Sequence, residues 1–296
     1  MQAGIKPLGR ERWWVFILLA PTLVGLIFGA FGSVLATVGI SFLHWDLLTP
    51  PTWAGLDNFR DLLTDKLFLD SLRNTVGFSI LYVPLVIVIS LGVAMLLNRK
   101  IQGLAIFRVV YFTPVVSSAV AVGLVWLWIY AKDTGVLNYM IVSLGGQPVR
   151  WLSPKNALVS VVIVNVWGAI GEGMIIFLAG LQSIPRDYYE AAQVDGANEW
   201  HLFRHITLPL ITPSIFFQAI ISTINALQAF EYIYILTRSG SGNSSTTPTL
   251  VYSIYRNGFN FFRMGTASAQ AVVLAAIIFI LTLIYFQLQR RWVNYE

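Results

Sequence analysis

The stretch LRNTVGFSILYVPLVIVISLGVAMLL, residues 72–97, decides the fold class of this chain. It contains one charged residue, Arg73, close to its start, and the rest of the stretch is uncharged. A helix needs about 20 mostly apolar residues to cross a bilayer. Because the apolar positions form a continuous run and do not alternate with polar ones, the pattern predicts a transmembrane helix and not a strand of a membrane barrel.

Five further runs of the same kind occur in the chain. The composition agrees with this count, since 56% of the 296 residues are hydrophobic and 11% are charged, whereas a soluble domain has about 25% charged residues. The other runs lie at residues 13–42, 107–130, 157–181, 210–236 and 269–288. We therefore predict an all-α membrane protein with about six transmembrane helices.

The charged loops give an expected orientation. An even number of spans places both termini on one side, and short loops rich in Lys and Arg favour the cytoplasm. The turn 98–108 holds Arg99, Lys100 and Arg108. Lys6 and Arg10 precede the first apolar run, and this run is about twice as long as the core of a cleaved signal peptide. We therefore expect a retained first span, cytoplasmic termini and a multi-pass membrane protein.

The loops suggest how the chain is organised. Residues 1–71 would form a tail, the first span and an acidic outside loop, residues 72–288 a core of five spans, and residues 289–296 a cytoplasmic tail. The stretch 237–249 is rich in Gly, Ser and Thr, which predicts a flexible outside loop.

Several function classes are disfavoured. The formal net charge is +5, but the basic residues are scattered over short loops and form no basic stripe, so nucleic acid is not expected as a partner. The absence of cysteine excludes disulfides, thiolate metal sites and a Cys nucleophile. The sequence has neither a G-x-x-x-x-G-K-S/T phosphate loop nor an H-E-x-x-H motif. We therefore expect no ATP site, no metal and no cofactor in this chain, and no enzyme activity of its own.

The inside segment 182–209 reads QSIPRDYYEAAQVDGANEWHLFRHITLP. Pro185 is suited to open a helix, and Gly196 is suited to end it with a left-handed cap. A second short helix would follow over residues 199–206, until Pro209 stops it. Such a hairpin either packs on the protein's own spans or inserts into a groove of a partner.

The residues of this hairpin resemble a known family. Glu190-Ala191-Ala192, Gly196, Ile206 and Leu208-Pro209 resemble the EAA loop of ABC importer permeases, whose form is E-A-A, three residues, G, nine residues, I-x-L-P. Nine residues also separate Gly196 from Ile206 here. The segment 178–185 is similar to the sugar-importer branch, and 55–59 resembles its first permease subunit. The chain departs from the pattern at 237–249, and it lacks the large periplasmic insert of the maltose-transporter first permease.

This resemblance implies a type I ABC importer permease fold in a bacterial-type inner membrane. It implies a second homologous permease, two cytoplasmic ATPase subunits that bind ATP and Mg, an extracytoplasmic binding protein and a sugar or sugar-like solute. It also implies the residues that couple the chain to the ATPases, namely Glu190, Ala191, Ala192, Asp195, Gly196, Ile206, Leu208 and Pro209.

Polar residues inside the expected spans are candidates for the solute pathway. A charged group at a helix centre costs about 2.5–3.5 kcal/mol on insertion scales, so it usually faces protein or water. On the fourth and fifth runs the spacings of three, four and seven place several polar residues on shared helix faces. The candidates are Asn165, Glu172, Gln218, Asn225, Gln228, Glu231 and Tyr232. They would bind solute or, alternatively, form hydrogen bonds between helices.

Other interpretations stay open. Glu172 and Glu231 would act as proton relays if the chain were a proton-coupled secondary transporter. The chain would be a structural subunit if a second permease bound all the solute. Trp126 and Trp128 are typical of an aromatic belt at the membrane interface.

Overall fold

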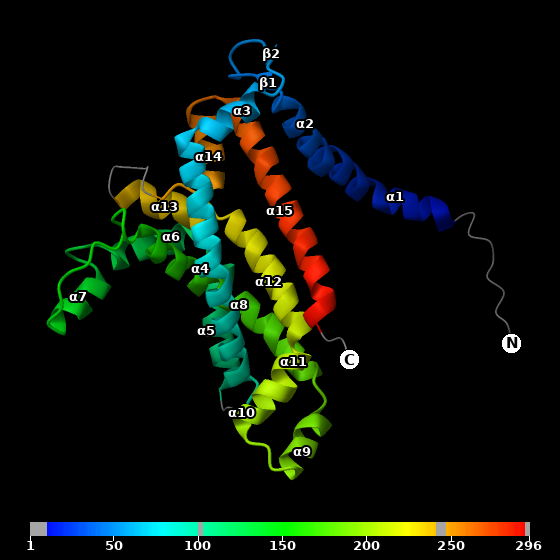
Figure 1. Cartoon of the computed structure of the whole chain (residues 1–296), viewed down its shortest axis with the longest axis vertical. Helices are drawn as coiled ribbons and strands as arrows, with labels where there is room; N and C mark the ends of the chain where they lie inside the picture. The colour runs from blue at the N-terminus through cyan, green and yellow to red at the C-terminus, as the bar shows by residue number, and fades with distance from the viewer. Residues whose placement is uncertain (1–10, 100–102, 241–246, 294–296) are drawn as a thin grey trace. The chain divides into compact units, whose positions relative to one another are not determined.

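The computed structural model describes residues 11–99, 103–240 and 247–293, so Lys6, Arg10 and Lys100 lie outside the described residues. Almost all regular elements are helices (Figure 1). The chain divides into two compact units, residues 1–62 with 256–273 and residues 63–255 with 274–296. This division differs from the expected boundary after residue 71, because the segment 256–273 groups with the N-terminal part.

The first unit contains the first span and a small polar cap. Its hairpin is antiparallel, with Leu43 opposite Trp53 and His44 opposite Thr52. The backbone N–H of Met264 donates to the Trp45 carbonyl at 2.9 Å, which joins the start of α15 to the hairpin. The elements are α1 (Glu11–Val24), the π-helix η1 (Gly25–Phe31), α2 (Gly32–Ile40), β1 (Leu43–His44), β2 (Thr52–Trp53), α3 (Asp57–Thr64), the π-helix η3 (Arg256–Asn260) and the start of α15 (Met264–Trp292).

The second unit is a helical bundle that contains the hairpin predicted at residues 182–209. Its long helices α4 and α8 pack along each other, and α5 and α12 pack against them. The elements are α4 (Lys66–Leu97), α5 (Leu104–Val116), α6 (Ala119–Ile129), α7 (Val136–Ser143), α8 (Ala157–Ser183), α9 (Arg186–Val194), α10 (Glu199–Leu202), the π-helix η2 (Phe203–Thr207), α11 (Leu208–Leu210), α12 (Thr212–Leu227), α13 (Glu231–Gly240), α14 (Leu250–Tyr255) and the rest of α15.

The core of this bundle lies along α8. Phe78 and Val86 of α4 and Val164 and Phe177 of α8 are fully buried, and they belong to two clusters that follow the two helices. Small residues allow the close approach, since a side chain at Gly171 would meet the Tyr111 backbone of α5. Tight backbone contact through small residues is typical of helix packing in membranes.

The prediction of about six spans is confirmed, with a change in their form. Four helices are long and apolar enough to cross a membrane, and two bent pairs bring the total to as many as six within the described residues. The four are Trp13–Ile40, Lys66–Leu97, Ala157–Ser183 and Met264–Arg290. They match the expected runs 13–42, 72–97, 157–181 and 269–288.

The third span, expected as one apolar run at residues 107–130, consists of two helices. α5 and α6 meet at an angle of 101°. Ser117 and Ser118 have extended backbone conformations between the two helices. Pro114 lies inside the last turn of α5 and has no N–H for the helical ladder. Hydropathy alone does not detect such a break.

The fifth run, expected at residues 210–236, is also interrupted. α12 ends at Leu227, and Glu231 starts a separate helix, α13. A second bend, of 64°, separates Glu199–Leu210 from α12. The second helix of the hairpin was expected to stop at Pro209. It instead continues through the π-helical turn η2 to Leu210.

The expected flexible loop at 237–249 is ordered at both ends. Thr237 lies within α13, and its hydroxyl donates to the Ile233 carbonyl at 2.6 Å. Thr249 is fully buried and donates to the Ala229 carbonyl at 3.0 Å. Residues 241–246 lie outside the described residues.

Candidate functional site

The first arm of the helical hairpin 182–209 is α9, which ends in a glycine cap. Pro185 precedes the helix as its N-cap residue, as the sequence predicts. Gly196 has φ +81°, and its N–H donates to the Gln193 carbonyl at 3.0 Å. The next N–H, of Ala197, donates to the Ala192 carbonyl at 2.9 Å. These two bonds make a Schellman motif, which satisfies the last carbonyls of the helix and reverses the chain.

The second arm begins at a polar cap. The Asn198 side-chain oxygen accepts a hydrogen bond from the His201 N–H at 2.9 Å. The chain is then helical through α10, η2 and α11 up to Leu210. Since α12 starts at Thr212, the hairpin is connected to a membrane-spanning helix by a single bend.

Two contacts hold the hairpin in place. The hydroxyl groups of Tyr189 and Thr207 are 2.9 Å apart, and this hydrogen bond connects the two arms. Arg99, in the turn after α4, donates to Glu199 at 3.1 Å. Both side chains of this ion pair are largely exposed, so it stabilises the fold by at most about 1 kcal/mol.

The expected coupling residues form an accessible surface at the end of the bundle (Figure 1). Glu190, Ala191, Asp195 and Gly196 are exposed. Leu208 is also exposed, whereas three of the expected residues are half-buried, namely Ala192, Ile206 and Pro209. The Glu190 carboxylate and the first-arm turn are thus available to a partner.

Sequence reasoning missed three exposed apolar side chains on the same hairpin. Val194 is 88% exposed, Trp200 is 64% exposed and Tyr188 is 53% exposed. Exposed aromatic side chains are enriched at protein interfaces. The signal was present in the sequence, because all three stand among charged residues in a segment expected at the membrane surface.

The polar residues expected on one face of α8 differ in how far they are buried. Asn165 donates to the Val161 carbonyl of its own helix at 2.9 Å and is half-buried. Glu172 is exposed on this chain. A side chain at Gly168 would lie 3.4 Å from the Tyr232 hydroxyl, so α8 and α13 are in close contact there.

The expected polar face of the fifth run is divided. Gln218 is 2% exposed, and its amide donates to the Ser222 hydroxyl at 3.0 Å. Asn225 is exposed on α12, and Gln228 is exposed at the residue that ends this helix. Glu231 and Tyr232 belong to the separate helix α13, so these five residues do not share one helix face.

The described residues contain no group of three metal-ligating side chains. His201 and His205 stack on each other with ring centroids 4.2 Å apart, on the exposed surface of the hairpin.

Comparisons with known proteins match this arrangement. A family model described as "Binding-protein-dependent transport system inner membrane component" matches residues 86–294. The chain is 38% identical to "Probable ABC transporter permease protein YesP" of Bacillus subtilis, over 95% of this chain and 92% of that protein. It is 32% identical to the trehalose/maltose transport system permease protein MalF of Thermococcus litoralis, over 95% of both.

A solved structure is similar over almost the whole chain. It is a bacterial ABC transporter involved in the import of the acidic polysaccharide alginate, and it matches with a TM-score of 0.84 and 26% identity. The match covers 96% of this chain and 98% of the other.

Proposed function

Because the chain belongs to the family of binding-protein-dependent transport system inner membrane components, we propose that it moves a sugar or sugar-like solute inward as one permease subunit of an ATP-driven importer. The observation that supports coupling most directly is the exposed hairpin with its glycine cap. A sugar-like solute is supported by the relatives, which include permeases named for trehalose/maltose and lactose transport.

The hairpin would transmit the movement of an ATPase to the membrane. Its two arms are connected by the Tyr189–Thr207 hydrogen bond, so that a push on α9 also displaces α10. The second arm continues with one bend into α12, which carries Asn225. Movement at the membrane surface would therefore change the position of a polar residue within the membrane.

The proposed partners follow from the same family. A second homologous permease would complete the pathway, two cytoplasmic ATPase subunits would hold ATP and Mg, and an extracytoplasmic binding protein would deliver the solute. One match is a bacterial alginate ABC transporter in complex with an alginate pentasaccharide-bound periplasmic protein, which supports the binding protein as a partner. We place the hairpin and both termini in the cytoplasm.

The alternative of a proton-coupled secondary transporter is not favoured. The relatives are ABC transporter permeases. Glu172 lies on α8, and Glu231 starts α13.

The proposed coupling is tested with the complete importer reconstituted in lipid. ATP hydrolysis is measured with and without solute-loaded binding protein, for the native complex and for Glu190→Ala. We expect the variant to lose most of the stimulation, because a charge-assisted hydrogen bond to the ATPase is removed. Asp187→Asn is the control, since this carboxylate is exposed on the same helix. Equal stimulation in all three complexes would contradict the role of Glu190.

A further inference from the structure

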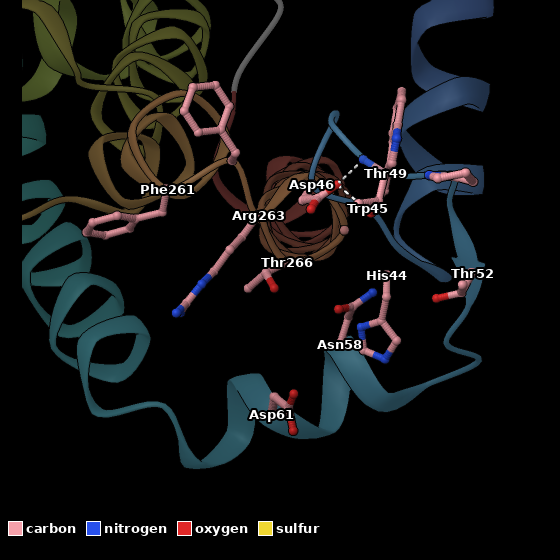
Figure 2. Close-up of a pocket in the computed structure, with 13 residues that line it drawn as sticks. His44, Trp45, Asp46, Thr49, Thr52, Asn58, Asp61, Phe261, Arg263 and Thr266 are labelled. Atoms are coloured by element: carbon pink, nitrogen blue, oxygen red, sulfur yellow. Dashed lines mark hydrogen bonds between the residues drawn. The ribbon is translucent and has the colours of Figure 1, made fainter.

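A polar cavity of about 450 Å³ lies in the first unit. Pockets for small ligands occupy roughly 300–1,000 Å³, so this cavity has a suitable size. Its walls come from three places in the sequence, which are the β1–β2 hairpin, helix α3 and the start of α15. Figure 2 shows the side chains from these elements arranged around one space.

The lining offers hydrogen-bond donors and acceptors together. Carboxylates come from the β1–β2 hairpin and from α3, and an imidazole comes from β1 (Figure 2). A guanidinium comes from the residue before α15, and a hydroxyl comes from the first turn of α15. These groups belong to Asp46, Asp61, Arg263, Thr266 and His44. The charges of two carboxylates are partly offset by one guanidinium, so the lining of the cavity carries no strong net charge. A neutral ligand with many hydroxyl groups matches this set, because each hydroxyl both donates and accepts.

Aromatic side chains complete the wall. Trp45 lies on the hairpin, and Phe261 precedes α15. The Arg263 guanidinium carbon is 5.9 Å from the centre of the Phe261 ring, which restrains the guanidinium. Aromatic surfaces beside a few polar groups are typical of small-molecule sites.

Several contacts fix this wall before any ligand binds. Asn58 is 2% exposed, and its amide donates to the Ser41 and Leu43 carbonyls at 2.9 Å each. A side chain at Gly265 would clash with the Leu43 carbonyl, so α15 approaches the hairpin closely. The Thr49 N–H and hydroxyl donate to Asp46 at 2.7 and 2.8 Å. These bonds lower the pKa of Asp46 below its ordinary value, which keeps the carboxylate ionised.

The backbone beside the cavity is unusual. Among the described residues, two that are not glycine have positive φ, Leu47 at 66° and Phe262 at 54°. Phe262 lines the cavity, and Leu47 follows Asp46. Residues held in this region cost roughly 1–3 kcal/mol each and concentrate at functional sites.

We propose that this cavity is a binding site for a neutral saccharide. The inference rests on the proposed function, since it assumes a sugar-like solute. In the proposed orientation the hairpin between the first two spans faces the outside. The cavity would then hold a sugar residue at the outer surface.

The test uses the complete importer in lipid nanodiscs, without the binding protein. Saturation-transfer NMR measures transfer from the protein to maltose, and separately to sn-glycerol 3-phosphate. We expect transfer to maltose that falls several-fold in Asp61→Asn and in Arg263→Gln. The matched controls are Asp70→Asn and Arg73→Gln, because these exposed residues lie on α4 and do not line the cavity.

Three results would overturn the proposal. They are no transfer to maltose, an equal signal in the cavity variants and the controls, or a variant-sensitive signal for sn-glycerol 3-phosphate alone. Transport by the complete importer with loaded binding protein is measured in parallel. If sugar transport is intact and the cavity signal is absent, this inference fails while the proposed function stands. If the cavity binds maltose but the importer moves no sugar, the proposed function fails.

Discussion

Replacing Gly196 by Val isolates the backbone conformation of the hairpin turn. Gly196 has φ +81°, and a Cβ built there meets no atom within 4 Å. The added Cβ therefore creates no steric clash, and the expected cost comes from the left-handed conformation, roughly 1–2 kcal/mol for a residue with a Cβ. This energy lowers the population of the native turn by about 5–30-fold. A β-branched residue is expected at the upper end of this range.

The assay compares binding-protein-stimulated ATP hydrolysis in reconstituted importers that carry Gly, Asn, Ala or Val at position 196. We expect Asn to behave almost like Gly, because Asn tolerates the left-handed region. Ala should lose part of the stimulation and Val most of it, with reduced retention of the ATPase during purification. If Asn and Val are equally impaired, side-chain size and not φ determines the effect. Full coupling in the Val variant would refute the role of the turn.

Three further perturbations test other parts of the structure. The chain has no cysteine, so a single Cys introduced by substitution reports its own position. In intact cells an impermeant thiol reagent should label a Cys at Leu48 and should not label a Cys at Val194. The opposite labelling pattern would mean that the orientation is inverted. Replacing Asn225 and Gln228 together by Leu should reduce transport in a complex that still assembles, and loss of assembly would instead indicate a packing role. Gly171→Ala should destabilise the α5–α8 contact by about 1–3 kcal/mol through overpacking, seen as a lower melting temperature, whereas Gly92→Ala, where a Cβ meets nothing within 4 Å, should not.

Local features of the hairpin were predictable from the sequence. Pro185 and Gly196 act on their own neighbours, and the structure places them at the start and the end of α9 as expected. The six apolar runs were also predictable, since each one must satisfy its backbone polar groups within itself.

Features that depend on distant residues, or on backbone conformations that hydropathy does not describe, were not predictable. The bend between α5 and α6 depends on extended backbone at Ser117 and Ser118, which an apolar run does not reveal. The polar cavity requires Arg263 and Asp61, which are far apart in the sequence, to share one wall. The order at Thr249 depends on a carbonyl twenty residues earlier, at Ala229.

Within the described residues, none of the most apolar window of the first span, Trp13–Ile40, is buried, against 6% for Met264–Arg290 and 50% for Ala157–Ser183. Contacts within the described part of this chain therefore do not determine which apolar residue stands at each position of that window. A complete substitution scan would reveal what the span meets. Uniform tolerance to apolar exchange would indicate lipid on every side, whereas a stripe of intolerant positions repeating every three to four residues would mark a seam with another subunit.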